Sequence, residues 1–163
     1  MKLNLGCGYK KLNGYINIDV STEVNPDYVM DLDNPKWKKE WKGKIEYVLL
    51  DNVLEHLEKP IKLLESIKEI RKKGCIIDIR VPYHYEKSDT FHHKIAGFHE
   101  KSFRKFYTDT QRPYYSKLQL KPIKIKKIPY DYAKKIPFKK YLDRFLTGIY
   151  REIRYEMEIL WKK

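Results

Sequence analysis

The sequence predicts an α/β protein built on a largely parallel sheet. Two short apolar runs, residues 45–50 and 75–81, have the length of strands in such a sheet, and an amphipathic helical pattern lies between them. Strands that alternate with helices form βαβ units with right-handed connections. A length of 163 residues fits one domain, so we expect residues 1–163 to form a single domain.

Shorter apolar blocks predict the first three strands. Leu3 and Leu5 precede a glycine pair, a second block at residues 15–18 precedes Asp19, and a third covers residues 28–31. Only ten residues separate Gly8 from Asp19, which leaves little room for a helix. We therefore expect a shortened first crossover, with a hairpin between the first two strands as the open alternative.

The fourth strand and the helix after it have the clearest patterns. Residues 45–50 are typical of a strand buried on both faces of a parallel sheet. The helix is expected to begin at Pro60, a residue favoured in the first helical turn, and Gly74 stands where a left-handed residue would end it. The apolar face of this helix consists of Ile61, Leu64, Ile67 and Ile70.

Four further elements are predicted after Pro82. Residues 100–107 indicate a short helix, and residues 118–125 indicate a sixth strand that Pro122 forces to bulge or to lie at an edge. Alternating apolar residues from 153 to 161 predict a last strand. A second helix is predicted by apolar residues at helical spacing, namely Phe138, Leu142, Phe145 and Ile149.

Charge divides the chain unequally. The formal net charge is +13, but residues 1–93 hold 16 basic and 15 acidic side chains, whereas residues 94–163 hold 19 and 7. The excess therefore belongs to the second half and predicts an anionic partner. Interleaved lysines and tyrosines suit single-stranded nucleic acid, although outward strand and helix positions explain part of the excess. These residues are Lys117, Lys121, Lys124, Lys126, Lys127, Lys134, Lys135, Lys139 and Lys140, with Tyr114, Tyr115, Tyr130, Tyr132 and Tyr141.

Cysteine usage and hydropathy limit the class of protein. The two cysteines, Cys7 and Cys75, form no paired motif, which argues against a disulfide framework and a tetracysteine zinc site. No apolar run reaches the roughly 18 residues of a membrane span, and no secretory leader is apparent. We expect a cytoplasmic protein, a monomer or homodimer, without a membrane span. The abundance of Lys, Glu, Ile and Tyr is typical of growth at high temperature.

Four segments carry the chemical signal: residues 3–8 (LNLGCG), 14–21 (GYINIDVS), 30–32 (MDL) and 51–57 (DNVLEHL). In order and spacing they resemble class I S-adenosylmethionine-dependent methyltransferases of the small methyltransferase type 11 kind. The resemblance covers residues 2–108, and residues 156–162 (EMEILWK) are similar to the family's seventh strand. It implies a Rossmann-like, seven-stranded, mostly parallel sheet with an antiparallel last strand. It also implies S-adenosylmethionine as methyl donor and S-adenosylhomocysteine as product.

The resemblance places the cofactor in residues 1–82. It implies that Gly6, Cys7 and Gly8 pass beneath the methionine part, with Leu5 beside them, and that Asp19, with Val20, holds the ribose hydroxyls. Glycines at the end of a first strand let a ligand approach the backbone, and an acidic residue ending the second strand can accept from a ribose. The remaining implied contacts are Asp31 and Leu32 at the adenine, and Asp51 and Asn52 at the sulfonium. Turn or capping chemistry is the alternative role for Asp31.

Histidines are the candidate bases for the acceptor. His56, His92 and His93 could take a proton near neutral pH, although His56 could instead fix a helix by hydrogen bonding. The expected acceptor pocket consists of Tyr9, Tyr83 and His84, with residues 89–99. Residues 83–163 are expected to form the acceptor-side half of the domain. Because no HxxxH or HExxH spacing occurs, we predict no metal site.

The sequence thus predicts a methyltransferase for an anionic acceptor. No NPPY-like segment follows the fourth strand, which favours an oxygen or ring nitrogen on a small molecule, sugar or protein side chain. One alternative is an RNA methyltransferase that uses the basic second half. Another is a module that binds the cofactor or a nucleotide without catalysis. The N-terminal helix that often covers the cofactor in the family has no counterpart ahead of residue 2, so a partner could supply that cover.

Overall fold

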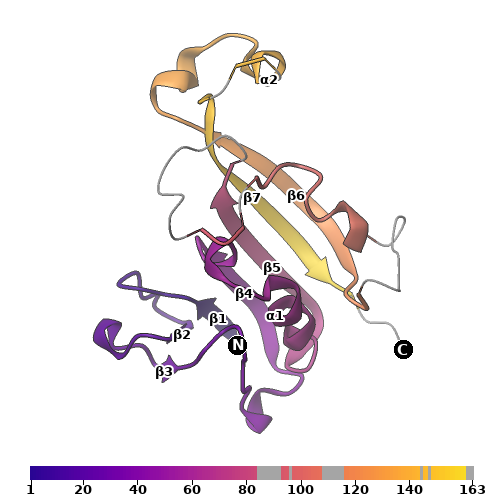
Figure 1. Cartoon of the computed structure of the whole chain (residues 1–163). Coiled ribbons are helices and arrows are strands. Elements are labelled where there is room, and N and C mark those ends of the chain that lie inside the picture. The colour runs from indigo at the N-terminus through magenta and orange to yellow at the C-terminus, as the bar shows by residue number, and fades with distance from the viewer. Residues whose placement is uncertain (84–92, 96, 108–115, 144, 147, 161–163) are drawn as a thin grey trace.

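A computed structural model describes residues 1–83, 93–95, 97–107, 116–143, 145–146 and 148–160. Seven strands form one sheet in the order β3-β2-β1-β4-β5-β7-β6 (Figure 1). Their bounds are β1 (Lys2–Leu5), β2 (Ile16–Asp19), β3 (Tyr28–Val29), β4 (Ile45–Asp51), β5 (Arg71–Pro82), β6 (Leu120–Pro129) and β7 (Tyr150–Ile159).

The pairing directions confirm the predicted fold class. Strands β1 to β5 pair in parallel, whereas β7 is antiparallel to both β5 and β6. In the first pair Leu3 lies opposite Ile16 and Leu5 opposite Ile18 in parallel register, which excludes a hairpin between β1 and β2. The structure is therefore a mostly parallel α/β sheet whose last strand runs backwards.

One helix of two turns covers the sheet. Helix α1 (Pro60–Ile67) begins at its proline, as predicted, and buries Leu63, Leu64 and Ile67 against the strands. The second helix, α2 (Lys139–Leu142), is a single turn. The remaining helical segments are 3-10 turns: η1 (Thr22–Val24), η2 (Lys39–Trp41), η3 (Leu54–His56), η4 (Arg104–Phe106) and η5 (Tyr132–Lys135). The described residues contain no helix long and apolar enough to cross a bilayer.

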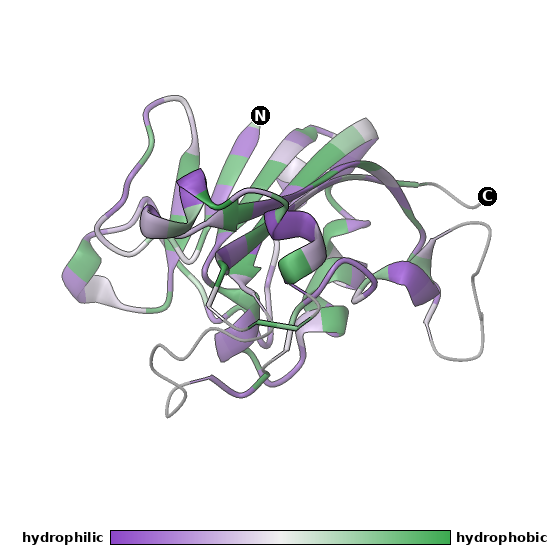
Figure 2. Ribbon diagram, turned by 90° about the horizontal axis from the view of Figure 1, so that it is seen from above, coloured by the Kyte–Doolittle hydropathy of each residue, from purple (hydrophilic) through white to green (hydrophobic). Residues whose placement is uncertain are grey.

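The two faces of the sheet differ in polarity. Across four strands, Leu5, Leu50, Ile79 and Tyr155 are register neighbours, and all four are fully buried. The row one residue further along β4, β5, β7 and β6 faces the other way and consists of Asp51, Arg80, Arg154 and Lys126. Figure 2 shows the resulting alternation of hydrophobic and hydrophilic residues along the strands. We call these the apolar face and the polar face.

Crossover handedness explains this difference. Right-handed connections that run in opposite directions along a sheet lie on opposite faces. The β4-to-β5 connection contains α1 and covers the apolar face, so the β1-to-β2 and β2-to-β3 connections belong to the polar face. Those connections, residues 6–15 and 20–27, contain no helix except η1. The shortened first crossover is thus confirmed, and it leaves the polar face largely without a helical layer.

Two asparagines hold the short first crossover to the sheet. Asn4 Nδ2 donates to Asn17 Oδ1 and to the Lys10 carbonyl, both at 3.0 Å. The Leu12 amide donates to Asn17 Oδ1 at 2.8 Å. Asn4 is therefore a neutral donor that anchors the loop to β2.

Two details of the central strands differ from the sequence predictions. Gly74 does not end α1, which finishes seven residues earlier at Ile67; with φ of 78° it lies inside β5. The β4–β5 register shifts there, since Ile45 pairs with Arg71 but Tyr47 pairs with Ile76. A left-handed glycine accommodates such an irregularity at low cost. The prediction that residues 45–50 are buried on both faces is also wrong, because Glu46 is exposed.

The predicted helices after residue 82 are largely wrong, whereas the strands are confirmed. Residues 100–107 form only the 3-10 turn η4. The predicted helical stripe at residues 138–149 contains only α2, and Phe138 and Phe145 are 77% and 84% exposed. This segment extends beyond the end of the sheet between β6 and β7 (Figure 1), where the described residues provide no layer to cover those rings. Strand β6 is the edge strand, and its register shifts at Pro122, as predicted.

Candidate active site

A cavity of about 340 Å³ lies at the carboxyl ends of β1, β2 and β4. Ligands of open α/β sheets bind at this end of the strands, and the volume falls in the range of about 300 to 1,000 Å³ of ligand pockets. Six of the predicted cofactor residues line it together: Gly6, Asp19, Val20, Asp31, Leu32 and Asn52. Asp33, Val53, His56 and Leu57 complete the lining.

Gly6 is required by a close approach of the chain to itself. It has a φ of 63°, and a Cβ atom built on it would lie 2.5 Å from Cγ2 of Val53. Gly8 has a φ of 49°, and a Cβ atom built on it would have no neighbour within 4 Å. The first glycine thus lets the segment after β4 reach the cavity, whereas the second serves only the turn.

Asp19 joins the glycine turn to the end of β2. Its Oδ2 accepts from the Gly8 amide at 2.8 Å, and its Oδ1 accepts from the Ser21 amide at 3.0 Å. Each carboxylate oxygen can accept two hydrogen bonds, so both retain capacity for a ligand hydroxyl. The backbone therefore presets the orientation of this carboxylate at the cavity wall.

Asp31 and Asp33 organise the opposite wall. Asp31 Oδ1 accepts from the Asp33 amide at 2.9 Å, the turn chemistry considered as its alternative role. Asp33 Oδ1 accepts from the Lys59 amide at 2.8 Å, directly before α1. Asp31 itself is exposed and lines the cavity, so its second oxygen can still meet a ligand.

Asp51 and Asn52 diverge at the end of β4. Asn52 has a φ of 55° and lines the cavity. Asp51 is on the polar face, with Oδ2 at 3.6 Å from Arg80 Nη1 and 4.0 Å from Lys10 Nζ. Asp51 is thus engaged away from the cavity lining. Leu5 and Cys7 are buried in the structure and do not belong to the lining either.

The histidine region brings together three polar side chains. The rings of His56 and His93 meet edge to face with centroids 5.0 Å apart. The Glu55 carboxylate lies beside them and is buried to 1% exposure. Burial raises the pKa of Glu55, and the charges of Asp51 and Glu152 act in the same direction, against its own backbone amide and His56. His84 and His92 lie outside the described residues.

The tyrosines predicted for the acceptor pocket lie elsewhere. Tyr9 is 83% exposed. Tyr83 is buried, and its hydroxyl donates to Asp143 Oδ2 at 2.8 Å. Lys127 contacts the same carboxylate and lies 2.7 Å from Glu100 Oε1. Burial and the bond to Asp143 raise the pKa of Tyr83, so the group is a neutral donor within a partly buried ion-pair cluster.

Solved structures with this arrangement of strands are numerous. A S-adenosylmethionine-dependent methyltransferase from Mesorhizobium loti matches 96% of this chain and 89% of its own, with a TM-score of 0.65 and 8% identity. The fold is that of class I S-adenosylmethionine-dependent methyltransferases. No protein-family model matches the sequence, and neither does any curated protein.

Two other solved structures with this methyltransferase fold are named for different activities. One is a complex between the Haloferax volcanii Trm112 methyltransferase activator and a methyltransferase, with a TM-score of 0.63, 15% identity, and coverage of 99% of this chain and 82% of that one. The other is the [4+2]-cyclase SpnF, with a TM-score of 0.61, 9% identity, and coverage of 96% and 74%. The methyltransferase fold therefore does not by itself fix the reaction.

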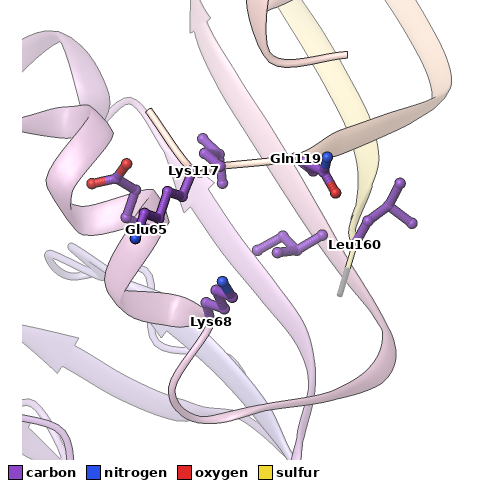
Figure 3. Close-up of a pocket in the computed structure, with 7 residues that line it drawn as sticks. Glu65, Lys68, Lys117, Gln119 and Leu160 are labelled. Carbon is purple, nitrogen blue, oxygen red and sulfur yellow. The ribbon is translucent and has the colours of Figure 1, made fainter. Parts of the chain in front are cut away.

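A second cavity, of about 240 Å³, lies at the other end of the sheet of this methyltransferase fold. Figure 3 shows it between α1 and the edge formed by β6 and β7, with Glu65, Lys68 and Lys117 around it. The cavity adjoins Ile159, the last residue of β7. Because β7 is antiparallel to β5, its end lies beside the amino ends of the parallel strands. Ligands bind at the carboxyl ends in such sheets, so this cavity is the weaker candidate.

Sequence reasoning about the methyltransferase fold missed four residues at the site. Asp33, Val53 and Leu57 line the cavity, and Glu55 adjoins it. Val53, Glu55 and Leu57 belong to residues 51–57, in which the sequence predicts only Asp51, Asn52 and His56 as site residues. Val53 and Leu57 flank the 3-10 turn η3, and His56 is its last residue, so the lining of this segment does not follow helical spacing.

Proposed function

We propose that this protein is a S-adenosylmethionine-dependent methyltransferase that acts on an anionic acceptor. The observation that carries the proposal is the cavity in which Gly6, Asp19, Asp31 and Asn52 converge at the carboxyl ends of the strands. Residues 1–82 would bind the cofactor and residues 83–163 would form the acceptor side, together one functional domain.

The cavity offers complementary groups for each part of the cofactor. The Asp19 carboxylate has free acceptor capacity for the ribose hydroxyls. Val20, Leu32 and Leu57 supply apolar walls for the adenine, and the exposed oxygen of Asp31 can accept from its amine. Gly6 and Asn52 then border the position of the methionine part. When bound, S-adenosylmethionine supplies a methyl group on a positively charged sulfur that leaves as a neutral thioether.

The chain's own contribution to methyl transfer is to orient the acceptor and handle its proton. In-line attack requires the acceptor atom to approach the methyl carbon opposite the sulfur. A hydroxyl acceptor must lose its proton as the new bond forms, and imidazole is suited to this near pH 7. His56 lines the cavity, and the ring of His93 contacts the ring of His56. This position supports the pair as the group that takes the proton of the acceptor. His92 remains a prediction.

The cofactor assignment is tested by calorimetric titration with S-adenosylhomocysteine. Asp19→Ala removes a charged acceptor, and loss of such hydrogen bonds weakens binding at least about tenfold. Glu23→Ala, an exposed carboxylate on the next turn, is the matched control and should leave the affinity unchanged. Absence of binding by the wild type at millimolar ligand, or equal binding by the Asp19→Ala variant, would refute the cofactor assignment.

The acceptor class is tested by a methyl-transfer screen. Purified protein and radiolabelled S-adenosylmethionine are incubated with cell extract separated into RNA, protein and small-molecule fractions. We expect label in the small-molecule or protein fraction. A blank in all three fractions, with intact cofactor binding, would favour a module that binds the cofactor without catalysis.

RNA is the second candidate acceptor because of the basic polar face. Lys124, Lys126 and Arg154, together with Glu156, line a small cavity on β6 and β7. Phosphate contacts through such side chains release counterions, so RNA affinity would fall steeply with rising salt. A weak affinity that is independent of salt would mean that these residues serve only as a solvated surface.

A further inference from the structure

We propose that Glu55, His56 and His93 form a binding site for one divalent transition-metal ion at the rim of the cavity. The single coordinating atoms that each side chain offers all lie within 4.8 Å of one another. Glu55 and His56 come from η3, and His93 comes from a segment far along the chain.

The buried carboxylate of Glu55 is the first argument. Its side chain is 1% exposed, and neither Oε1 nor Oε2 has a hydrogen-bond partner among the described residues. Buried polar groups in folded proteins are almost always satisfied, and a carboxylate without a partner carries a large desolvation cost. A cation held between this carboxylate and the neighbouring imidazoles would supply what the chain itself does not.

The kind of ligand set is the second argument. Two imidazoles and one carboxylate suit zinc, iron, cobalt and manganese, and three protein ligands leave positions open for an exogenous ligand. An imidazole that binds an ion through one nitrogen keeps the other for a hydrogen bond. His56 is exposed and His93 partly exposed, which gives an ion a path of entry.

The backbone explains why a residue from beyond β5 reaches η3. The amides of Lys94 and Ile95 donate to the Glu55 carbonyl at 2.8 and 3.1 Å. Lys94 Nζ also lies 3.0 Å from Glu58 Oε1. These bonds fix the chain directly after His93 against η3. Ligand atoms on one zinc ion lie about 3.3 Å apart, so side-chain rotation within this fixed frame suffices to close the site.

The position of the site gives it a role in the reaction, and this step rests on the proposed function. His56 lines the cavity, so an ion bound to it would lie at the rim where the acceptor enters. A metal ion lowers the pKa of a bound hydroxyl and neutralises negative charge on an acceptor. With an ion bound, the two histidines would hold it as ligands, and the proton of the ion-bound hydroxyl would pass to water in place of an imidazole.

Metal binding is tested with Co²⁺, whose visible absorption reports coordination by nitrogen and oxygen. The full chain is treated with EDTA, dialysed into chelator-free buffer and titrated. We expect one Co²⁺ per chain, and an affinity at least about tenfold weaker in both Glu55→Gln and His93→Ala. His99→Ala, which removes a histidine outside the cluster, should bind Co²⁺ as the wild type does.

Three outcomes would overturn the metal site: no saturable binding by the wild type, undiminished binding by Glu55→Gln, or equal weakening in the His99→Ala control. Circular dichroism checks that each variant is folded, and Glu55→Gln preserves side-chain volume so that loss of binding is not loss of packing. Titration with S-adenosylhomocysteine in EDTA separates the two proposals. Cofactor binding without Co²⁺ binding refutes only the metal site, and the reverse refutes only the cofactor assignment.

Discussion

Arg154 on the antiparallel strand β7 holds the fully buried carboxylate of Asp78 on the parallel strand β5. The Nε and Nη2 atoms of Arg154 each donate to Asp78 at 2.7 Å. Tyr47 donates to the same carboxylate at 2.9 Å, and Arg80 lies 3.3 Å away. This cluster ties the reversed strand to the parallel part of the sheet on the polar face, on which the described part of the chain places no α-helix.

Arg154→Met should destabilise the protein by roughly 2 to 4 kcal/mol. Removing one partner of a buried ion pair is costly because it leaves the other charge without compensation, and the remaining contacts of Asp78 reduce the cost. The measurement is urea unfolding followed by tryptophan fluorescence. Arg151→Met, at an exposed residue near the start of the same strand, should change the free energy of unfolding by less than about 0.5 kcal/mol. Similar losses in the two variants would contradict this account.

Tyr47→Phe should destabilise the protein at pH 8 and progressively less above pH 10. Burial and the bond to Asp78 raise the pKa of Tyr47 to about 12. The native state therefore favours the neutral phenol; this contribution is complete below the unfolded-state pKa of about 10 and is lost as pH rises toward 12. Urea unfolding at pH 8 and pH 11 gives the two differences. In Tyr141→Phe, where the ring is 65% exposed, the stability should match that of the wild type at both values.

Gly6→Ala should impair both folding and cofactor affinity, whereas Gly8→Ala should cost only its backbone conformation. Both positions are left-handed, which costs an alanine about 1 to 2 kcal/mol. Only at Gly6 would the new Cβ meet Val53, at 2.5 Å, and push a residue that lines the cavity. Thermal unfolding and S-adenosylhomocysteine titration compare the variants. Val53→Ala in the Gly6→Ala background should restore part of the loss, and no restoration would place the constraint elsewhere.

Both thiols should resist modification in the folded protein. Burial raises the pKa of Cys75 to about 11, and burial together with the charge of Asp19 raises that of Cys7. The thiolate is the reactive form, so dithionitrobenzoate at pH 7.5 should react slowly with the native chain. In concentrated guanidinium chloride it should titrate two thiols. Rapid reaction of one thiol under native conditions would show that the glycine turn opens.

The sequence was most informative where side-chain pattern and backbone geometry coincide. Pro60 marked the start of α1 and Pro122 an edge strand with a register shift, because a missing amide restricts both positions. It was least informative where packing decides. Phe138 and Phe145 have helical spacing, yet both rings are exposed. The spacing of apolar residues does not show whether another element lies in place to cover them.

At the candidate site, the segments that end β1 and β2 were predictable because their chemistry is local. Gly6 and Asp19 follow apolar runs directly, and both line the cavity. Glu55 was not predictable, because its significance arises from burial and from the approach of His93, which a bond to its own carbonyl arranges. The family resemblance implies a place for Asp51 at the sulfonium, which stays a prediction; in the structure strand alternation turns its carboxylate toward Arg80.

A helical layer on one face of the sheet, as the described residues show, changes the amino-acid composition that the strands require. A sheet covered on both faces requires apolar residues at nearly every strand position, whereas here every second position faces water or another polar side chain. This is how a sequence with 35% charged residues still forms a seven-stranded core. Charges on the outward positions of β6, and on those of β7 other than Arg154, can therefore vary without altering the layer that supports the cavity.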